Sequence, residues 1–318
     1  MIYMENKVIS NKTSEDLQDE SLANKLRVRV GVIRQFWRHR WTEILFALKP
    51  DKFRRGEFLV KFLKKKKIIR LDEAQDNFYF QDWHFYFNGK YFGEILADLI
   101  SIWGYSDKYF RDEIINLRPG FYEGPYEQAN FFVRAGDSVV DVGANIGLYS
   151  AFASRQAGLD GVVYAFEPIK KARELLIKNI ACNQLVNVKV EECALSNIAG
   201  KEKFSISENL GNSSGFFTED RPTDFTSEEV VLETLDNLVN RGTVAKVDFI
   251  KVDIEGMERS FLQGAKETIK KFHPRLAICI YHRPDDREVL AQLIKDFEPN
   301  YQISFNKTKL FAIYENSN

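Results

Sequence analysis

The stretch VVDVGANIGLYS, Val139 to Ser150, decides the fold. Three of its first four residues are valines, and this apolar run predicts a buried strand. Gly143 and Gly147 then predict a tight turn, and the residues from Leu148 onward predict a helix. Such a turn, with bare backbone amides at a helix N-terminus, is typical of the ligand-binding edge of an open α/β sheet.

The polar residues of this stretch indicate which ligand the turn would bind. A dinucleotide-binding turn needs a second glycine at the place held by Asn145, and here Asp141 also puts a carboxylate inside the strand. A second apolar strand, Gly161 to Phe166, ends at Glu167, where a carboxylate can accept both hydroxyls of a ribose. S-adenosylmethionine carries a sulfonium and an ammonium and has no phosphate. We therefore predict an S-adenosylmethionine site, with Asp141 at the cationic end and Glu167 at the ribose.

The remaining cofactor contacts are predicted from the ends of the strands. Glu192, Cys193 and Ala194 follow the next expected strand, Val186 to Glu191, and are expected near the adenine. The set predicted from the turn and the strand ends is Asp141, Gly143, Asn145, Gly147, Glu167, Pro168, Glu192, Cys193, Ala194 and Asp253, and the family resemblance given next adds Glu123 and Tyr126.

Six short motifs, taken in order, resemble those of the FkbM-type methyltransferases. The resemblance runs from about Phe121 to the C-terminus. It implies a class I fold, S-adenosylmethionine as the methyl donor, and acceptors that are mostly hydroxyl groups. It also implies that the connector with Glu123 and Tyr126 helps to close the cofactor pocket. The motifs are EGPYE (123–127), GDSVVDVGANIGLYS (136–150), AFEP (165–168), CALSNIAG (193–200), ETLDNL (233–238) and FIKVDIEGMERSFLQGA (249–265).

A second chemical centre is predicted after the strand Asp248 to Val252. Asp253, Glu255 and Glu258 lie within six residues around Gly256, at the sheet edge where open α/β folds place reacting groups. The alternative is that these carboxylates cap the helix expected from Met257, and for Glu258 this alternative is equally favoured.

The strand Arg275 to Ile280 brings Tyr281 and His282 to the same edge. We predict that Asp253, Glu255 and His282 surround the acceptor hydroxyl and that His282 or Asp253 removes its proton. A plain loop histidine is the competing interpretation of His282. Asp253 and Glu255 do not make a complete ligand set for a metal ion, and no metal site is predicted.

The order of the expected strands and helices predicts the architecture of residues 119–318. Strands and helices alternate, which is typical of a doubly wound, mostly parallel α/β sheet with right-handed crossovers. With a terminal antiparallel hairpin, Tyr301 to Phe305 and Leu310 to Tyr314, the sheet is expected to have seven strands, as in class I methyltransferases. Asp236 is expected to cap the helix that begins at Asn237.

The N-terminal third is expected to be organised differently. Residues 1–23 are polar without periodicity and are expected to be loose. Residues 24–118 form a predicted accessory region, with an apolar stripe at helical spacing and then an aromatic stretch in which nine of the fifteen residues 78–92 are Phe, Tyr or Trp. Strands over 82–87 and 90–92, joined at Asn88-Gly89, would form a hairpin. We expect its aromatic residues to pack against a neighbouring domain; the alternative is that they stack on a sugar.

Composition limits the cellular setting and the partners. The net charge is -1, yet residues 21–70 hold 16 Lys plus Arg against three acids. This segment is either a solvated face of an accessory helical pair or, over residues 24–70, a contact for an anionic lipid-linked sugar or a membrane surface. Nucleic acid is not expected, because no known nucleic-acid-binding motif is present. Three cysteines without metal-like spacing, and the lack of a signal peptide or an 18-residue apolar window, predict a cytoplasmic protein.

The function predicted from these features is S-adenosylmethionine-dependent O-methyl transfer to a hydroxyl of a sugar or glycan-type acceptor. Two alternatives stay open. One is methylation of another small molecule or of a protein. The other is a non-catalytic, cofactor-binding scaffold of a glycan-processing assembly. The oligomeric state is not determined by the sequence.

Overall fold

The computed structural model describes residues 69–72, 76–80, 82–87, 102, 126–128, 130–207, 215–216 and 225–315. Several predicted features lie outside these ranges: the tail 1–23, the basic segment up to residue 68, the strand expected over 90–92 and the connector residue Glu123. The domain boundaries at residues 23 and 118 therefore stay predictions. No helix in the described ranges has the length and apolar character needed to cross a membrane.

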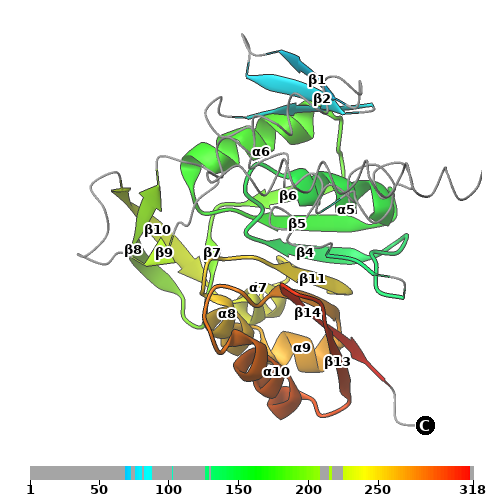
Figure 1. Ribbon diagram of the computed structural model, residues 1–318, viewed down its shortest axis with the longest axis vertical. Helices are drawn as coiled ribbons and strands as arrows, with labels where there is room; N and C mark the ends of the chain where they lie inside the picture. Colours follow the sequence, from blue (N-terminus) through cyan, green and yellow to red (C-terminus); the bar gives the residue numbers. More distant parts are fainter. Residues whose placement is uncertain are drawn as a thin grey trace, which may run out of the picture. The chain divides into compact units, whose positions relative to one another are not determined.

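A seven-stranded sheet forms the centre of the described structure (Figure 1). Its strands follow the order β13-β14-β12-β11-β4-β5-β6. The five strands from β12 to β6 are parallel, and β14 runs antiparallel to both β12 and β13. The predicted mostly parallel sheet with a terminal antiparallel hairpin is confirmed. The strands are β4 (Ser138–Val142), β5 (Val162–Phe166), β6 (Val188–Glu191), β11 (Phe249–Val252), β12 (Arg275–Cys279), β13 (Tyr301–Phe305) and β14 (Lys309–Tyr314).

Both faces of the sheet are covered because the inner strands are apolar on both sides. Alternate residues point to opposite faces, so Val139 packs with Phe152 of α5 in one core cluster while Val140 packs with Phe261 of α8 in another. Figure 1 shows α5 and α6 on one side of the sheet and α7 to α10 on the other. The helices are α5 (Leu148–Ala157), α6 (Lys170–Cys182), α7 (Leu235–Asn240), α8 (Glu258–Gly264), α9 (Lys266–Phe272) and α10 (Asp286–Phe297).

A smaller sheet is inserted between β6 and β11, in the order β7-β10-β8-β9. Its long strand β10 was not predicted from the sequence, although Val230 and Leu232 are buried on either side of the half-exposed Val231, as a strand requires. The strands are β7 (Ala194–Leu195), β8 (Gly200–Ser207), β9 (Gly215–Phe216) and β10 (Phe225–Glu233).

Asp236 caps a different helix from the one predicted. The hydroxyl of Thr234 caps α7, because it accepts the backbone N–H of Asn237 at 3.0 Å. The Asp236 carboxylate instead accepts the N–H groups of Glu267 and Thr268, at 3.1 and 2.7 Å, and so caps the first turn of α9. Sequence proximity favoured the nearer helix, whereas packing of α7 against α9 brings the second one within reach.

The aromatic stretch forms a three-stranded antiparallel sheet, β1 (Ile69–Asp72), β2 (Asn77–Phe80) and β3 (Trp83–Tyr86). The strand predicted over 82–87 is present as β3, but its partner is β2. Among the described aromatic residues, Phe78, Phe80, Trp83 and Phe85 are buried in the same cluster as α5, which favours packing over sugar stacking.

Two asparagines one turn apart on α6 hold the edge of this sheet. Asn179 accepts the N–H of Tyr86 at 2.6 Å and donates to its carbonyl at 3.1 Å, and Asn183 pairs with both backbone groups of His84 in the same way. These side-chain amides satisfy the backbone of β3 as a neighbouring strand would. Asn179 also donates to the Ile146 carbonyl at 2.8 Å, so it links the accessory sheet to the glycine turn.

Candidate functional site

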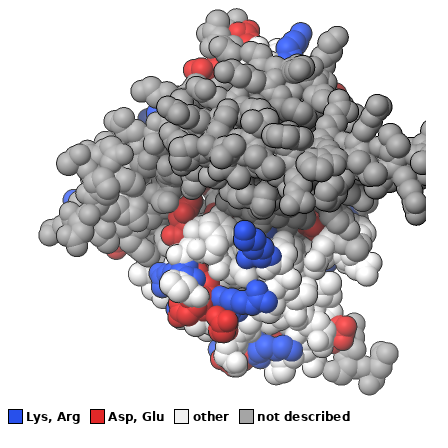
Figure 2. Space-filling model, viewed as in Figure 1, with Lys and Arg blue, Asp and Glu red and all other residues white. Residues whose placement is uncertain are grey.

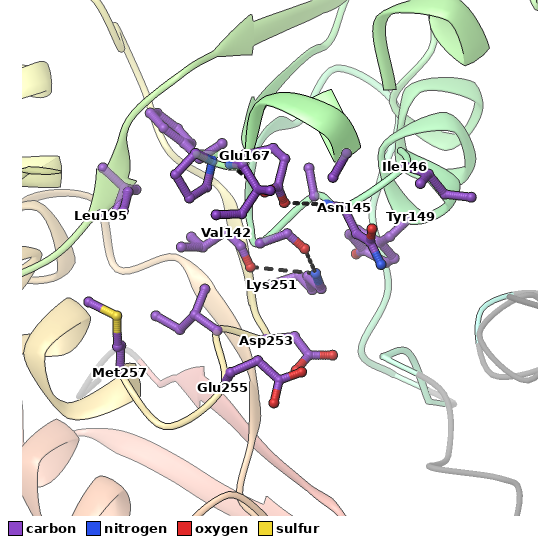
Figure 3. Close-up of a pocket in the computed structure, with 18 of the residues that line it drawn as sticks. Val142, Asn145, Ile146, Tyr149, Glu167, Leu195, Lys251, Asp253, Glu255 and Met257 are labelled. Atoms are coloured by element: carbon purple, nitrogen blue, oxygen red, sulfur yellow. Dashed lines mark hydrogen bonds between the residues drawn. The ribbon is translucent and has the colours of Figure 1, made fainter. Parts of the chain in front are cut away.

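A cavity of about 190 Å³ opens at the carboxyl ends of β4, β5 and β11 (Figure 3). Nine of the residues predicted for the site line it: Tyr126, Gly143, Asn145, Glu167, Pro168, Cys193, Ala194, Asp253 and Glu255. Four predicted residues do not line it: Asp141, Gly147, Glu192 and His282. Glu123 lies outside the described residues. The binding and catalytic roles of all these residues stay predictions.

The glycine turn forms one wall of the cavity. Gly143, Asn145 and Gly147 all have left-handed backbone conformations, with φ of 79°, 49° and 89°. Asparagine is among the few residues besides glycine that adopt this conformation readily.

Close packing within the protein also requires both glycines. A Cβ on Gly143 would lie 2.0 Å from the Asp253 carbonyl oxygen, and one on Gly147 would lie 2.4 Å from Cδ1 of Leu176. The glycines therefore let β11 and α6 approach the turn, whereas the sequence suggested that they make room for a ligand.

Glu167 lies in the cavity wall where the sequence places it. Its carboxylate accepts the backbone N–H of Asn145 at 2.8 Å and that of Ile169 at 2.9 Å, and so it spans the turns after β4 and β5. Burial raises its pKa to about 7, although these two hydrogen bonds oppose the shift. A carboxylate in this position can accept hydroxyl groups from a ligand in the cavity.

Asp141 is paired inside the protein. Its carboxylate is fully buried and lies 3.0 Å from Nζ of Lys251, which is itself only 5% exposed. Ser150 donates a hydrogen bond to the same carboxylate. Lys251 also donates to the Gly143 carbonyl at 2.7 Å, and Figure 3 shows Lys251 close to Val142 in the cavity wall. Lys251 balances the charge of Asp141, so this ion pair links β4 to β11, and Asp141 is not among the residues that line the cavity.

Two buried polar atoms in the cavity wall make no hydrogen bond within the described part of the chain. They are Oδ1 of Asn145 and the hydroxyl of Tyr149. Burying such groups without partners costs free energy, so they are suited to a ligand that both donates and accepts hydrogen bonds. An α-amino acid group, with its ammonium and carboxylate, has both properties.

Asp253 follows β11 and lies on the side of the cavity opposite Glu167 (Figure 3). The Tyr126 hydroxyl donates to its Oδ2 at 2.5 Å, and the Tyr281 hydroxyl is 3.4 Å from its Oδ1. Burial disfavours the charged form, but Lys251, His282 and Lys309 outweigh this effect and lower the pKa of Asp253. Asp253 is therefore an anion at neutral pH.

His282 lies behind the cavity wall, between three carboxylates. Its Nδ1 is 2.8 Å from the fully buried Glu258, and its Nε2 is 3.4 Å from Glu255 and 3.6 Å from Asp253. Burial lowers the pKa of His282, but the hydrogen bond to Glu258 and the three negative charges outweigh it and raise the pKa to about 9. His282 is then cationic at neutral pH and has no free nitrogen lone pair to act as a base.

Glu258 contacts the loop that precedes α8, and not the N–H groups of the helix that it was alternatively expected to cap. One carboxylate oxygen is near the N–H groups of Ile254 and Gly256, at 3.2 and 3.4 Å, and the same oxygen contacts His282. Glu255 has a φ of 57°, an uncommon conformation for a residue with a long side chain, and its carboxylate points in the same direction as that of Asp253 (Figure 3). No group of three or more His, Cys, Asp and Glu side chains among the described residues could hold a metal ion.

The raised pKa of His282 predicts a pH-dependent contribution to stability. The folded-state pKa of about 9 exceeds the ordinary value of 6.5, so this contribution is complete below pH 6.5 and is lost as the pH rises through 9. The difference corresponds to about 3 kcal/mol. The free energy of unfolding of the wild type should exceed that of His282→Gln by about 3 kcal/mol more at pH 6 than at pH 10. A difference that does not change with pH, measured by urea unfolding, would contradict this prediction.

Three residues of the site were missed from the sequence: Lys251, Lys309 and Tyr149. Lys309 is fully buried on β14, and its Nζ lies 4.3 Å from the centre of the Tyr126 ring. Lys251 carried a weak signal, because it stands one residue before the end of its strand, as Asp141 does. In parallel strands that end at one edge, such residues become neighbours.

Known proteins resemble this chain over about half of its length. The model of the methyltransferase FkbM domain family matches residues 141–303. Methyltransferase sdnD of Sordaria araneosa is 28% identical over 46% of this chain and 66% of its own length. The 31-O-demethyl-FK506 methyltransferase FkbM of Streptomyces tacrolimicus is 30% identical over 42% of this chain and 62% of its own length. The hexuronic acid methyltransferase AglP of Haloferax volcanii is 26% identical over 57% of this chain and 72% of its own length. The chain spans just under two thirds of the length of sdnD and of FkbM.

Proposed function

Because this chain belongs to the methyltransferase FkbM domain family, we propose that it is an O-methyltransferase that acts on a hydroxyl of a sugar-type acceptor. The family uses S-adenosylmethionine as its methyl donor. One observation carries the proposal: a carboxylate that stays ionised, Asp253, faces the same cavity as Glu167 and the unpartnered polar atoms of Asn145 and Tyr149. The cavity thus has a place for the donor and a proton acceptor beside it.

The names of two relatives support transfer to a hydroxyl. One is named for a position at which FK506 carries an O-methyl group, and the other for hexuronic acid, which is a sugar acid. Both names describe those proteins. For this chain they favour an alcohol acceptor over a nitrogen or carbon acceptor, and AglP favours a sugar.

Three residues would hold the donor. Glu167 would accept the ribose hydroxyls, as its position after β5 suggests. Tyr149 would donate to the carboxylate of the methionyl end, and Asn145 would accept from the ammonium. When bound, the donor supplies a methyl group on a positively charged sulfur, and the sulfur leaves as a neutral thioether.

Asp253 would take up the proton of the acceptor hydroxyl. As the acceptor oxygen forms its bond to the methyl carbon and the carbon–sulfur bond breaks, the O–H proton must leave, and the Asp253 carboxylate faces the cavity as an anion. Tyr126 and the cationic His282 hold that carboxylate in place and keep it ionised. His282 is therefore a positioning residue in this proposal, and Asp253 is the base.

Product analysis tests this function directly. The purified chain is incubated with donor labelled in its methyl group and with a panel of simple glycosides and nucleotide sugars. We expect label in an alkali-stable methyl ether on at least one sugar. Label found only on protein or on nitrogen, or donor binding without any transfer to the panel, would overturn the sugar O-methyltransferase proposal.

Cofactor affinity should depend on pH through Glu167. Its pKa of about 7 means that the carboxylate is ionised above pH 7 and must lose a proton before binding below it. The affinity for S-adenosylmethionine, measured by calorimetry, should therefore fall by up to about tenfold per pH unit below pH 7.

A variant separates the titration of Glu167 from a general loss of structure at low pH. Glu167→Gln should bind more weakly at pH 8 by about tenfold to a hundredfold and should lose the pH dependence, because an amide cannot ionise. Glu174→Gln, an exposed change on α6, should behave as the wild type. Equal pH dependence in Glu167→Gln would show that another group is responsible.

A further inference from the structure

Arg283 lies next to the loop that follows β11, close to the cavity wall but not among the residues that line it. It follows His282 in the connection from β12 to α10 and is exposed. Its Nε would be 3.6 Å from a Cβ placed on Gly256, which has a φ of 95°. Gly256 belongs to the loop that carries Asp253 and Glu255, so the guanidinium stem of Arg283 lies against the loop whose carboxylates line the cavity.

The guanidinium of Arg283 has no hydrogen bond or ion pair in the described part of the structure. The two acids that follow it in sequence are paired elsewhere: Arg259 contacts Asp285 at 2.6 Å and Asp286 at 2.8 Å, and Arg283 acts on Asp285 only through charge, without an ion pair. Asp286 also accepts the backbone N–H of Arg283 at 2.9 Å, which fixes the main chain there. On the described surface that Figure 2 shows, Lys and Arg side chains mostly lie next to Asp and Glu side chains. An unpaired guanidinium in this setting is available to an anionic ligand.

Tyr281 provides a second feature at the same place. Its side chain lines the cavity and is 41% exposed, and its hydroxyl is 3.4 Å from Asp253. An exposed aromatic ring beside the proposed base offers a flat apolar surface on which the C–H face of a sugar ring can pack. The hydroxyl of such a sugar would then lie next to Asp253.

The charges at this end determine which sugar fits. Asp253 and Glu255 put negative charge in the cavity wall, so an acidic acceptor would be repelled unless a cation bound its acidic group. Arg283 supplies that cation, and its planar fork matches a carboxylate in a bidentate arrangement. We propose that the acceptor is a uronic acid, that Arg283 binds its carboxylate, and that Tyr281 lies under its ring. This inference rests on the proposed sugar O-methyltransferase function and names the acceptor class.

Matched acceptor pairs test the proposal. Methyl glucuronide and methyl glucoside, and the corresponding galacto and manno pairs, differ only in having a carboxylate or a hydroxymethyl group at C6. With labelled donor, we expect at least one uronide to be methylated with a kcat/KM at least about tenfold above that of its neutral partner, mainly through a lower KM. The 6-phosphate of the same sugar distinguishes a carboxylate site from a general anion site.

Two variants assign the preference to Arg283. Arg283→Met should lower kcat/KM for the uronide by about tenfold to a hundredfold. The kcat/KM of the uronide divided by that of its neutral partner should then approach one. Arg283→Lys should recover part of it, since the charge remains but the fork is lost. Arg287→Met removes an exposed arginine that lies over the Phe305 ring, and it should keep the preference.

Each contrary result has a distinct meaning. A neutral sugar methylated as well as its uronide, a preferred 6-phosphate, or an equal loss for both sugars in Arg283→Met would overturn the role of Arg283 while leaving sugar methylation in place. An absence of methylation across all pairs, with donor bound, would overturn the sugar acceptor itself. Thermal unfolding of each variant shows whether a loss of activity reflects misfolding. If Arg283→Met is misfolded, the preference of Arg283→Lys for the uronide tests the role of Arg283 in its place.

Discussion

Replacing Asp253 by Asn should reduce turnover by about a hundredfold to ten-thousandfold, the usual size of a general-base effect. The amide keeps the shape of the side chain and can still accept from Tyr126, but it cannot take up a proton from the acceptor hydroxyl. The measurement is the initial rate of methyl transfer at saturating donor and acceptor. Donor affinity is determined separately by calorimetry, so that a loss of binding is not counted as a loss of chemistry.

Two further variants make this result specific. Asp248→Asn changes a carboxylate next to the other end of β11, where it accepts the N–H of Ser138, and it should retain turnover. Glu255→Gln tests the second carboxylate in the wall and should have a smaller effect than Asp253→Asn. Full turnover in Asp253→Asn, combined with a large loss in Glu255→Gln, would transfer the role of base to Glu255.

The largest effect on stability is expected at Lys251. Lys251→Met removes the cation that balances the fully buried Asp141 and leaves that carboxylate without an ionic partner. Breaking a buried pair from one side costs about 3–5 kcal/mol. The free energy of unfolding, from urea denaturation, should fall by this amount at neutral pH.

The paired substitution tests whether charge is the cause. Asp141→Asn combined with Lys251→Met removes both charges at similar volume, and it should recover most of the lost stability, since buried ion pairs often add little net free energy. Lys246→Met breaks the partly exposed contact with Asp248 and should cost no more than about 1 kcal/mol. If the double variant were as unstable as Lys251→Met, packing of the lysine chain would be the cause.

Local patterns were enough to predict the elements that position the site. The valines before Gly143, the carboxylate after the second strand and the acids around Gly256 are each encoded within a few residues. Their distance from a strand end also specifies the sheet edge on which they lie. The terminal hairpin was also predicted, because its two strands and its turn are encoded within neighbouring residues. By contrast, the contact of β3 with Asn179 and the second helix capped by Asp236 depend on segments far apart in the sequence.

The sequence by itself determined the sheet, the glycine turn and the carboxylates that face the cavity, because strand periodicity and turn residues act over short distances. Only the tertiary structure decided what those carboxylates do. It paired Asp141 with Lys251 and placed His282 among three acids that raise its pKa to about 9. It left the Tyr149 hydroxyl without a hydrogen bond and the Arg283 guanidinium without an ion pair in the described part of the chain. Charge state and pairing depend on burial and on neighbours from other strands, and these are settled only when the strands come into register.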